Sequence, residues 1–424
     1  MYMGETGSTI SDTNGNLLFY TNGDTIWNKN HLVMANGTGL LNCQSSSQGG
    51  LIIKKPGSNN LFYIFTNDCE ENNCVSGVHY SIVDLSLNAG LGAVTIKNTL
   101  LYAPSTEKLT AVYHCNNNDV WIVGQTRNSN QFRSYLLTVA GINTTPITTN
   151  IGYIHNDNIS PAVGVMDFSP NKQKLAVVYS IFNPNGVEEL YDFDSSTGNI
   201  YNLITLPPDT SEYGVAFSND NQKLYIGSGG GGGVANKIYQ YDLSSNTPSL
   251  IISSKTLIHS NKWSSPIIDL RNGIDGKIYG TRFYLDSVAV INNPQLSGLA
   301  CNYNHTAISL NNKICHENFP RFNENYFSPT LTNTAACTVS IYDEKNMVEL
   351  ILFPNPVTDF IYFKMDTSQE IIIEIKDFIG NYIHKSEYYE EKFKVDVSQI
   401  QTGVYILNIK INKKQTKTIK LVKN

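Results

Sequence analysis

Four residues near position 300 carry the side chains of a zinc site. Cys301, His305, Cys315 and His316 stand in "CNYNH" and "KICHE", and thiolate and imidazole are ligands that zinc prefers. Zinc sites favour closely paired ligands such as C-x2-C, however, and the spacing here is irregular. We therefore favour a disulfide between Cys301 and Cys315, or plain packing, and predict neither a metal nor another cofactor.

The seven cysteines of the chain are an odd number and too sparse for a disulfide-stapled miniprotein. In "CEENNC", Cys69 and Cys74 can close a short loop if the protein is oxidised. Buried free thiols are the alternative, so the cysteines do not decide the compartment.

Two other motifs have a chemical and a structural interpretation. The run "GSGGGGGVAN" (227–236) lacks the Lys-Ser or Lys-Thr pair and the helix of a phosphate loop, so we predict a flexible connection between two strands. Asp192 and Asp194 in "YDFDSSTGN" suggest a calcium loop, but the length and the missing final Glu do not fit an EF-hand. Aspartates at a hairpin turn are the simpler interpretation.

The sequence shows no recognisable catalytic arrangement. GxSxG, HExxH and Ser/His/Asp patterns are missing, so we predict no catalytic residue, although paired carboxylates for glycoside hydrolysis could still meet from separate segments. Trp27, Trp121 and Trp263 lie near expected strand ends, where exposed rings could stack on sugars. Core packing is the favoured alternative for all three.

Composition indicates a soluble all-β protein of 424 residues. Gly, Asn, Ser and Thr provide turns, while Tyr, Ile and Val favour strands. Only 16% of residues are charged and the formal net charge is -6, which gives no support to nucleic-acid binding. No apolar run is long enough to span a membrane. The start "MYMGETGSTISD" does not resemble a signal peptide.

A repeat must position these residues. Three segments share an apolar strand, a polar turn, a lysine and a second apolar strand, and three others are looser copies. The close copies are "MDFSPNKQKLAVVYS" (166–180), "VAFSNDNQKLYIGSG" (215–229) and "IDLRNGIDGKIYGTR" (268–282); the looser ones begin at residues 8, 51 and 109. Each predicts a β-hairpin.

The second strands of the hairpins recur every 44 to 59 residues, at Leu17, Leu61, Val120, Leu175, Leu224 and Ile278. A repeat of about 40–50 residues is typical of propeller blades, so residues 1–325 predict a β-propeller with six visible blades. "ICHENFPRF" (314–322) looks like the inner strand of one more. We therefore expect seven blades in the intact product, with upstream residues, including a signal peptide, missing from this chain.

The last 74 residues predict a second domain after a linker at 326–350. Seven short alternating strands in 351–424 indicate a small immunoglobulin-like β-sandwich. Pro354 and Pro356 fix an extended entry into it. Lysines including Lys420 make the last hairpin basic, which either protects an exposed edge strand or serves recognition.

Four features of this tail occur in a known family: the "PNP" entry, the "DFIGNYI" hairpin, the "GVYIL" strand and the basic last strand. In their order the tail closely resembles the type A C-terminal sorting domain of the type IX secretion system. The resemblance implies a sorting signal and a partner in the secretion machinery. The residues that carry it are Pro354, Asn355, Pro356, Gly380, Gly403, Tyr405 and Lys420.

Residues 5–325 also resemble a family. "ISDTNGNLLFYTNGDTIWNKNHLVMANGTGLL" (10–41), "SSSQGGLIIKKPG" (45–57) and "YGVAFSNDNQKLY" (213–225) are similar to large secreted propeller-like proteins of Bacteroidetes. This resemblance implies no catalysis. We therefore predict a secreted or surface-attached, non-catalytic binding or adhesion protein. The sequence does not name its extracellular ligand, for which a glycan is the candidate.

Two alternatives remain open. One is a propeller-type glycosidase or polysaccharide lyase exported by the same route, which would need carboxylates, Arg and Tyr converging at one end of the propeller axis. The other is an intracellular scaffold, which follows from a literal reading of the N-terminus.

Overall fold

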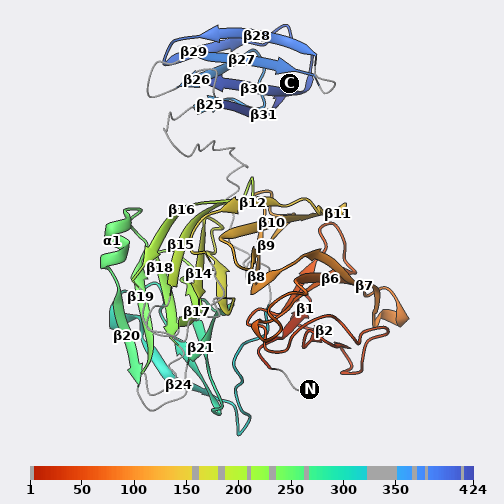
Figure 1. Cartoon of the computed structure of the whole chain (residues 1–424), viewed down its shortest axis with the longest axis vertical. Coiled ribbons are helices and arrows are strands. Elements are labelled where there is room, and N and C mark those ends of the chain that lie inside the picture. The colour runs from red at the N-terminus through yellow and green to blue at the C-terminus, as the bar shows by residue number, and fades with distance from the viewer. Residues whose placement is uncertain are drawn as a thin grey trace. The chain divides into compact units, whose positions relative to one another are not determined.

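The computed structural model describes residues 4–154, 162–179, 187–207, 212–228, 235–261, 267–321, 351–364, 370–377, 381–411 and 415–424. It divides into two compact units, Met1–Cys337 and Thr338–Asn424 (Figure 1). The predicted linker at 326–350 lies outside the described residues.

The described part of the first unit contains six antiparallel sheets, each built from consecutive strands. The first three comprise β1 (Ser8–Ser11), β2 (Leu17–Thr21) and β3 (Ile26–Asn28); β4 (Gly50–Lys54), β5 (Leu61–Asn67), β6 (Val78–Asp84) and β7 (Ala93–Tyr102); and β8 (Ser105–Tyr113), β9 (Val120–Thr126), β10 (Gln131–Thr138), β11 (Gly141–Ile142) and β12 (Ile147–Asn150).

The next three sheets have four strands each. They comprise β13 (Gly164–Phe168), β14 (Lys174–Tyr179), β15 (Val187–Asp194) and β16 (Asn199–Leu206); β17 (Glu212–Phe217), β18 (Lys223–Ser228), β19 (Asn236–Asp242) and β20 (Thr256–Asn261); and β21 (Ile267–Asn272), β22 (Ile278–Arg282), β23 (Ser287–Ile291) and β24 (Tyr303–Ser309). The helical segments are η1 (Glu70–Asn72), η2 (Asn88–Gly90), α1 (Pro248–Ser253) and η3 (Gly298–Cys301). Among described residues, no helix has the length and apolar character needed to cross a membrane.

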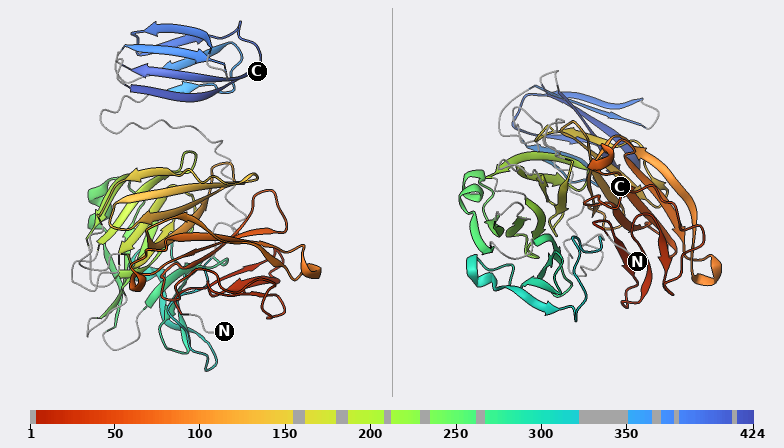
Figure 2. Two further views of the ribbon diagram at one scale, coloured as in Figure 1. Left: turned by 45° about the vertical axis from the view of Figure 1, so that its right-hand side comes forward. Right: turned by 60° about the horizontal axis from the view of Figure 1, so that its bottom comes forward.

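These sheets confirm the predicted all-β propeller. Their first strands contact one another in chain order, β8 with β13, β13 with β17 and β17 with β21, and the sheets follow one another around a centre in the right-hand view of Figure 2. Leu17, Leu61, Val120 and Ile278 each begin the second strand of a sheet, as the repeat predicts.

Two of the repeated hairpins use the same turn chemistry. The Ser169 and Ser218 amides donate to the carbonyl five residues later, at Lys174 and Lys223, over 2.9 Å in each case. Each serine hydroxyl also accepts the amide of that lysine, again at 2.9 Å. The shared "FS" and "QK" of the two segments therefore encode one turn, closed by its own side chain.

The segment at 314–322 differs from the predicted inner strand of a further blade. Up to Arg321 it forms one β-bridge, in parallel with Ser8 of β1. The Arg321 amide donates to the Gly7 carbonyl at 2.7 Å, and the Thr281 hydroxyl donates to the Glu317 carbonyl at 2.7 Å. The segment thus runs between the sixth and first sheets and joins them.

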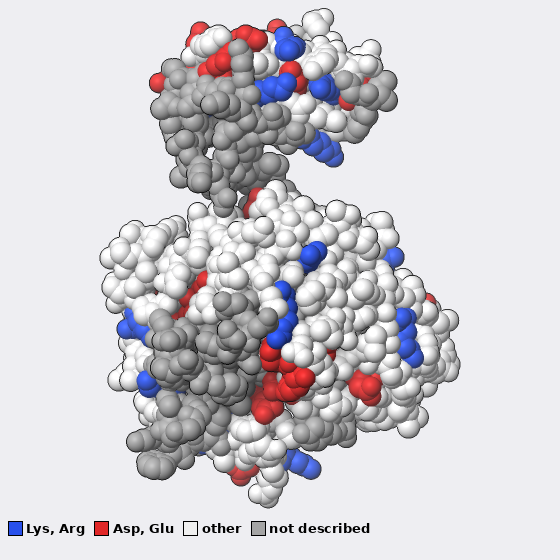
Figure 3. Space-filling view, in the orientation of Figure 1, with Lys and Arg blue, Asp and Glu red and all other residues white. Residues whose placement is uncertain are grey.

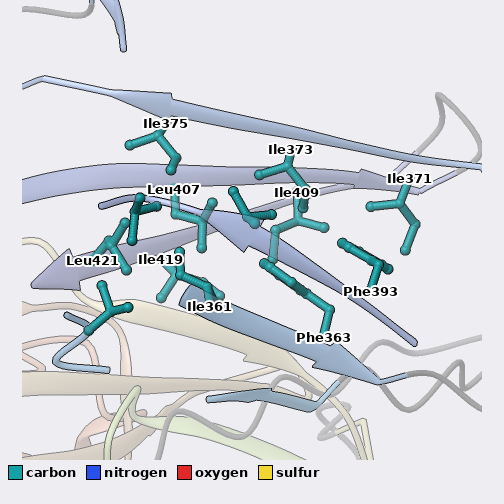
Figure 4. Packing of buried hydrophobic residues seen from close by; sticks show 13 residues of the cluster. Ile361, Phe363, Ile371, Ile373, Ile375, Phe393, Leu407, Ile409, Ile419 and Leu421 are labelled. Atoms are coloured by element: carbon teal, nitrogen blue, oxygen red, sulfur yellow. The ribbon is translucent and has the colours of Figure 1, made fainter. Parts of the chain in front are cut away.

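The second unit is a sandwich of two antiparallel sheets. One contains β25 (Ile351–Phe353), β26 (Phe360–Lys364) and β29 (Lys392–Asp396). The other contains β27 (Ile371–Lys376), β28 (Tyr382–Tyr388), β30 (Gly403–Ile411) and β31 (Gln415–Lys423). Inward side chains of both sheets, such as Phe363, Phe393, Ile373 and Leu407, pack against one another (Figure 4). The predicted seven-stranded sandwich is confirmed.

The expected Cys69–Cys74 disulfide is wrong. Cys69 is bonded instead to Cys43, 26 residues away, with a Cα–Cα distance of 5.5 Å. The reason is long-range: the loop before β4 lies across the end of β5, since the Cys43 amide donates to the Asn67 carbonyl at 3.3 Å. Cys74 is a buried free thiol.

The expected Cys301–Cys315 disulfide is wrong as well, because both thiols are free and buried. Cys301 ends η3, beside the outer strand β24. Cys315 belongs to the joining segment, where its amide donates to the Leu285 carbonyl at 2.7 Å. The two cysteines therefore occupy different parts of the sixth sheet's surroundings.

Candidate functional site

One end of the propeller gathers charged residues that are far apart in sequence. The first strands of all the sheets begin there, and the connections between second and third strands reach the same end, because the strands are antiparallel. We call this end the entry face. Its polar residues are Glu5, Ser47, Gln48, Glu107, Tyr213 and Glu317.

The loop before β4 reaches the inner strands of two later sheets. The Gln48 side chain donates to the Met166 carbonyl at 3.0 Å and accepts the Met166 amide at 2.9 Å. It also accepts the Leu109 amide at 3.2 Å. Gln48 therefore ties this loop to the inner strands β8 and β13 at once.

Ser47 and Glu107 form the buried part of the cluster. The Glu107 carboxylate accepts the Ser47 amide at 2.8 Å, the Ser47 hydroxyl at 2.5 Å and the Glu70 amide at 2.8 Å. Burial raises the pKa of Glu107, and these three donors oppose the rise. With its oxygens engaged inside the protein, Glu107 has a structural role.

Glu5 is a half-buried acid of the entry face. Burial raises its pKa to about 8, although the Tyr213 hydroxyl donates a hydrogen bond to it. The carboxylates of Glu107, Glu317 and Glu71 lie close enough to add to the rise. At neutral pH Glu5 is therefore mainly a protonated acid beside other acids.

A buried ion network connects the entry face to the joining segment. Asp269 accepts Arg271 Nε at 3.3 Å, Arg321 NH2 at 3.3 Å and the Phe319 amide at 3.0 Å. Arg271 also donates to Asp167 at 2.9 Å. These side chains are almost fully buried, so the network holds the first, fourth and sixth sheets together.

One exposed aromatic ring, that of Tyr284, lies in the connection between β22 and β23. The side chain of Tyr284 is 57% exposed, and its ring centroid lies 4.4 Å from that of Phe283 and 6.0 Å from that of His316. The Tyr284 amide donates to the Cys315 carbonyl at 2.9 Å, which ties the Tyr284 backbone to the segment that carries Glu317. Burial raises the pKa of Glu317.

The raised pKa of Glu5 predicts a pH dependence of stability. The folded state holds this proton up to about pH 8, whereas the ordinary pKa is 4.5, so the free energy of unfolding should fall as pH rises through that window. The slope from one site is at most about 1.4 kcal/mol per pH unit. Glu5→Gln, measured by urea unfolding from pH 4.5 to 8, should flatten the profile. Glu391→Gln, on an exposed acid of the second unit, should keep the wild-type slope, and equal slopes in all three proteins would contradict the prediction.

The three tryptophans considered as sugar-stacking residues lie in different environments. Trp121 is 5% exposed and donates from Nε1 to the Ser195 carbonyl at 2.9 Å, so it is a core residue. Trp27 is half-buried and stacks on its cross-strand neighbour Tyr20, with centroids 5.5 Å apart. Trp263 lies outside the described residues.

The structure does not bring the four candidate zinc ligands together at one site. His305 stacks on His259 at 4.7 Å, on the outer strands β24 and β20, whereas His316 lies by Tyr284. Within the described ranges, the one group of three close metal-ligating side chains is Cys43, Cys69 and Glu71, and its two cysteines form a disulfide.

The remaining motifs are structural where they are described. The Asp194 carboxylate accepts the Ser196 amide at 2.9 Å, and Asp192 pairs with Lys174 at 2.8 Å. The glycine run joins β18 to β19, neighbouring strands of one sheet, and its residues 229–234 lie outside the described residues.

The structure brings together the two ends of the predicted sorting signal. The Asn355 amide group donates to the Lys420 carbonyl at 2.8 Å and accepts the Val422 amide at 2.9 Å. The exposed Pro354 and Pro356 flank this contact. The predicted entry motif is therefore anchored on the last strand.

Other residues of the signal hold the long hairpin. Gly403 begins β30 opposite Lys423. The Tyr405 ring packs against the core, and its hydroxyl donates to the Gln401 carbonyl at 2.9 Å. Gly380 lies outside the described residues.

Sequence reasoning missed Glu5, Ser47, Glu107 and Tyr213. None belongs to a catalytic or metal-binding motif, and each stands just before or at the start of a first strand. The usable signal was positional, because a propeller brings the residues that precede its inner strands to one end.

Comparison with protein families bears on the second unit. The family model "Secretion system C-terminal sorting domain" matches residues 351–424. The predicted sorting domain is confirmed for that part of the chain, and it supports export by the type IX route to the medium or the cell surface. No curated protein matches the chain in sequence.

Several solved structures resemble the whole chain weakly. One is PorZ, an essential bacterial surface component of the type IX secretion system of Porphyromonas gingivalis, with 11% identity and a TM-score of 0.38; the match covers 99% of this chain and 57% of that one. Others are a putative 6-phosphogluconolactonase from Bacteroides fragilis (10% identity, TM-score 0.42, 97% and 96% coverage) and a periplasmic gluconolactonase from Pseudomonas aeruginosa (13%, 0.39, 86% and 97%). This chain thus spans little more than half of the PorZ chain, and no activity carries over from such low similarity.

Proposed function

We propose that this chain is a type IX secretion cargo whose propeller binds glycans at its entry face, without converting them, in a surface-binding or adhesion role. The observation that carries the binding proposal is the exposed Tyr284 ring, which contacts His316 next to Glu317 in the sequence. The half-buried carboxyl of Glu317 in turn lies near that of Glu5. Export is supported separately, by the sorting domain.

The chemistry of this face suits sugars. The apolar side of a pyranose ring stacks on an aromatic ring, and Tyr284 offers one held in place by Phe283 and His316. A sugar hydroxyl can donate a hydrogen bond to an ionised carboxylate and can accept one from a protonated carboxyl group. The protonated Glu5 offers a donor on this face, and ionised carboxylates beside it offer acceptors. Over the described residues, most of the surface in the view of Figure 3 belongs to uncharged side chains, and a sparsely charged surface supports a neutral ligand over a highly charged one.

A second candidate is hydrolysis of a glycosidic bond. It is favoured by the raised pKa of Glu5 and Glu317, since a glycosidase needs one carboxyl that stays protonated at neutral pH. A propeller-type glycosidase or lyase needs carboxylates, an arginine and a tyrosine at one end of the propeller axis. The entry face offers its carboxylates together with Tyr213 and Arg321. Against it, Glu107 and Asp269 are committed to internal hydrogen bonds.

A glycan array with the purified full chain tests the binding proposal, with chain length of each bound glycan followed over time. Tyr284 has φ of 58°, a conformation that asparagine tolerates well, so Tyr284→Asn removes the ring with little strain. We expect at least tenfold weaker binding for Tyr284→Asn and for Glu317→Gln.

The matched control is Tyr389→Asn, on a tyrosine that is 61% exposed in the sorting unit. It should bind as the wild type does. Equal binding by all variants would refute the entry-face site. Shortening of a bound glycan by the wild type but not by Glu317→Gln would replace the adhesion role with the hydrolytic one.

A further inference from the structure

The outer surface of the three-stranded sheet in the sorting unit carries aromatic rings and lysines. We call it the aromatic–lysine face. It consists of Phe353 on β25, Phe360, Tyr362 and Lys364 on β26, and Lys392 and Lys394 on β29.

Strand alternation places these residues on one side. Ile361 and Phe363 point into the core, with exposures of 0% and 2%, so their neighbours in β26 point outward. The register sets Phe353 opposite Tyr362, and Tyr362 opposite Lys394. A row therefore crosses all three strands.

The rings on this face are exposed but held in place. Phe353 is 52% exposed and Tyr362 is 43% exposed. Their rings stack with centroids 5.7 Å apart and planes 20° apart, and Lys394 Nζ lies 4.1 Å from the centroid of Phe360. Because these contacts already restrict the rings, a partner would lose little conformational entropy by binding them.

The larger sheet of the same unit offers a contrast. At its centre Glu374 is 1% exposed and pairs with Lys410 at 3.1 Å and Lys385 at 3.4 Å. Lys376 covers the ring of Tyr382 at 4.4 Å. Lys385 and Lys410 are thus matched by a carboxylate at the middle of the sheet.

The aromatic–lysine face lacks such a central acid. Among its described outward positions the one carboxylate is Asp396, at the end of β29, opposite Phe360. Aromatic residues at the centre and charged residues at the rim are the usual anatomy of a protein interface, where a few rings supply most of the affinity. With three lysines and one aspartate, the face carries a net positive charge, and this charge favours an acidic partner.

We propose that the aromatic–lysine face is the surface by which the sorting unit docks on an acidic protein surface of the export machinery. The inference rests on the proposed export function and adds to it the face and the chemistry of the partner. The rings fill the apolar centre of the contact, while Lys364, Lys392 and Lys394 pair with acidic side chains around it.

Export of full-length variants from a bacterium with a working type IX system tests this. Tyr362→Thr keeps a strand-forming residue and removes the ring, and Lys394→Glu reverses one rim charge. We expect at least fivefold less of each variant outside the cell than for the wild type. Tyr382→Thr and the exposed-lysine change Lys313→Glu are the matched controls, and both should be exported normally. Thermal unfolding of the purified variants checks that each is folded.

A chain ending at residue 350 separates the two proposals. If that chain is retained while Tyr362→Thr and Lys394→Glu are folded and exported normally, the docking face is refuted and the export route stands. If the shortened chain is exported as the wild type is, both are refuted. Binding to phosphatidylglycerol vesicles that both variants lose, with export intact, would assign the face to lipid and also overturn the inference. A defect in Tyr382→Thr equal to that of Tyr362→Thr would do the same.

Discussion

A chain that ends at residue 350 is expected to remain inside the cell, with at least a tenfold loss of export. The match to the sorting-domain family begins at residue 351, and residues 351–424 bury a core of their own. Ile361, Ile373 and Leu407 are each 0% exposed in that core. The signal is therefore carried by a folded unit that the propeller does not need for its own core.

Cell fractionation and immunoblotting measure this loss. The reciprocal experiment attaches residues 351–424 to a reporter that has a cleavable signal peptide, and the reporter should reach the medium or the surface. Ile373→Asp, which places a charge in the sandwich core, should reduce export about as much as the deletion, since burying an unpaired charge is costly enough to unfold a small domain. Normal export of the shortened chain would refute the assignment of the signal to this unit.

The repetitive part of the fold was predictable because its determinants are local. Ser169 and Lys174 lie five residues apart and close their own turn. The hairpin is therefore determined by residues that are close together in the sequence. The alternation of Ile361, Tyr362 and Phe363 likewise defines a strand with one buried face. Both features can be read without knowing what lies next to them.

The entry face was not predictable in this way. Ser47 meets Glu107 across 60 residues, and Tyr213 meets Glu5 across 208. Which residues precede an inner strand is visible in the sequence, but which of them touch depends on the path of the loops over the axis. The cysteines show the same limit, because proximity in sequence favoured Cys69–Cys74 and the loop path produced Cys43–Cys69.

The same long-range contacts make Asp269 the residue whose loss should cost the propeller most. Its carboxylate lies between two guanidinium groups, from Arg271 on its own strand and Arg321 on the joining segment, and it also accepts the Phe319 amide. The side chains of Asp269, Arg271 and Arg321 are almost fully buried. Removing the carboxylate would take from the buried Arg321 the carboxylate with which it pairs, and would leave Arg271 with Asp167.

Asp269→Ala is therefore expected to lower the free energy of unfolding of the propeller by about 3–5 kcal/mol, the usual cost of breaking a buried ion pair from one side. Asp269→Asn should cost nearly as much, because it keeps the size but not the charge. Urea unfolding of the full chain, followed by tryptophan fluorescence, measures the change, since Trp27, Trp121 and Trp263 all belong to the propeller.

Asp275→Ala is the matched control on the neighbouring turn. Asp275 pairs with Lys277 at 3.5 Å, but both side chains are about 40% exposed, so its loss should cost less than about 1 kcal/mol. If Asp269→Ala destabilises the propeller no more than Asp275→Ala does, the buried network does not join the sixth sheet to the first. The contacts of Glu317 and Arg321 with Thr281 and Gly7 would then have to hold that junction alone.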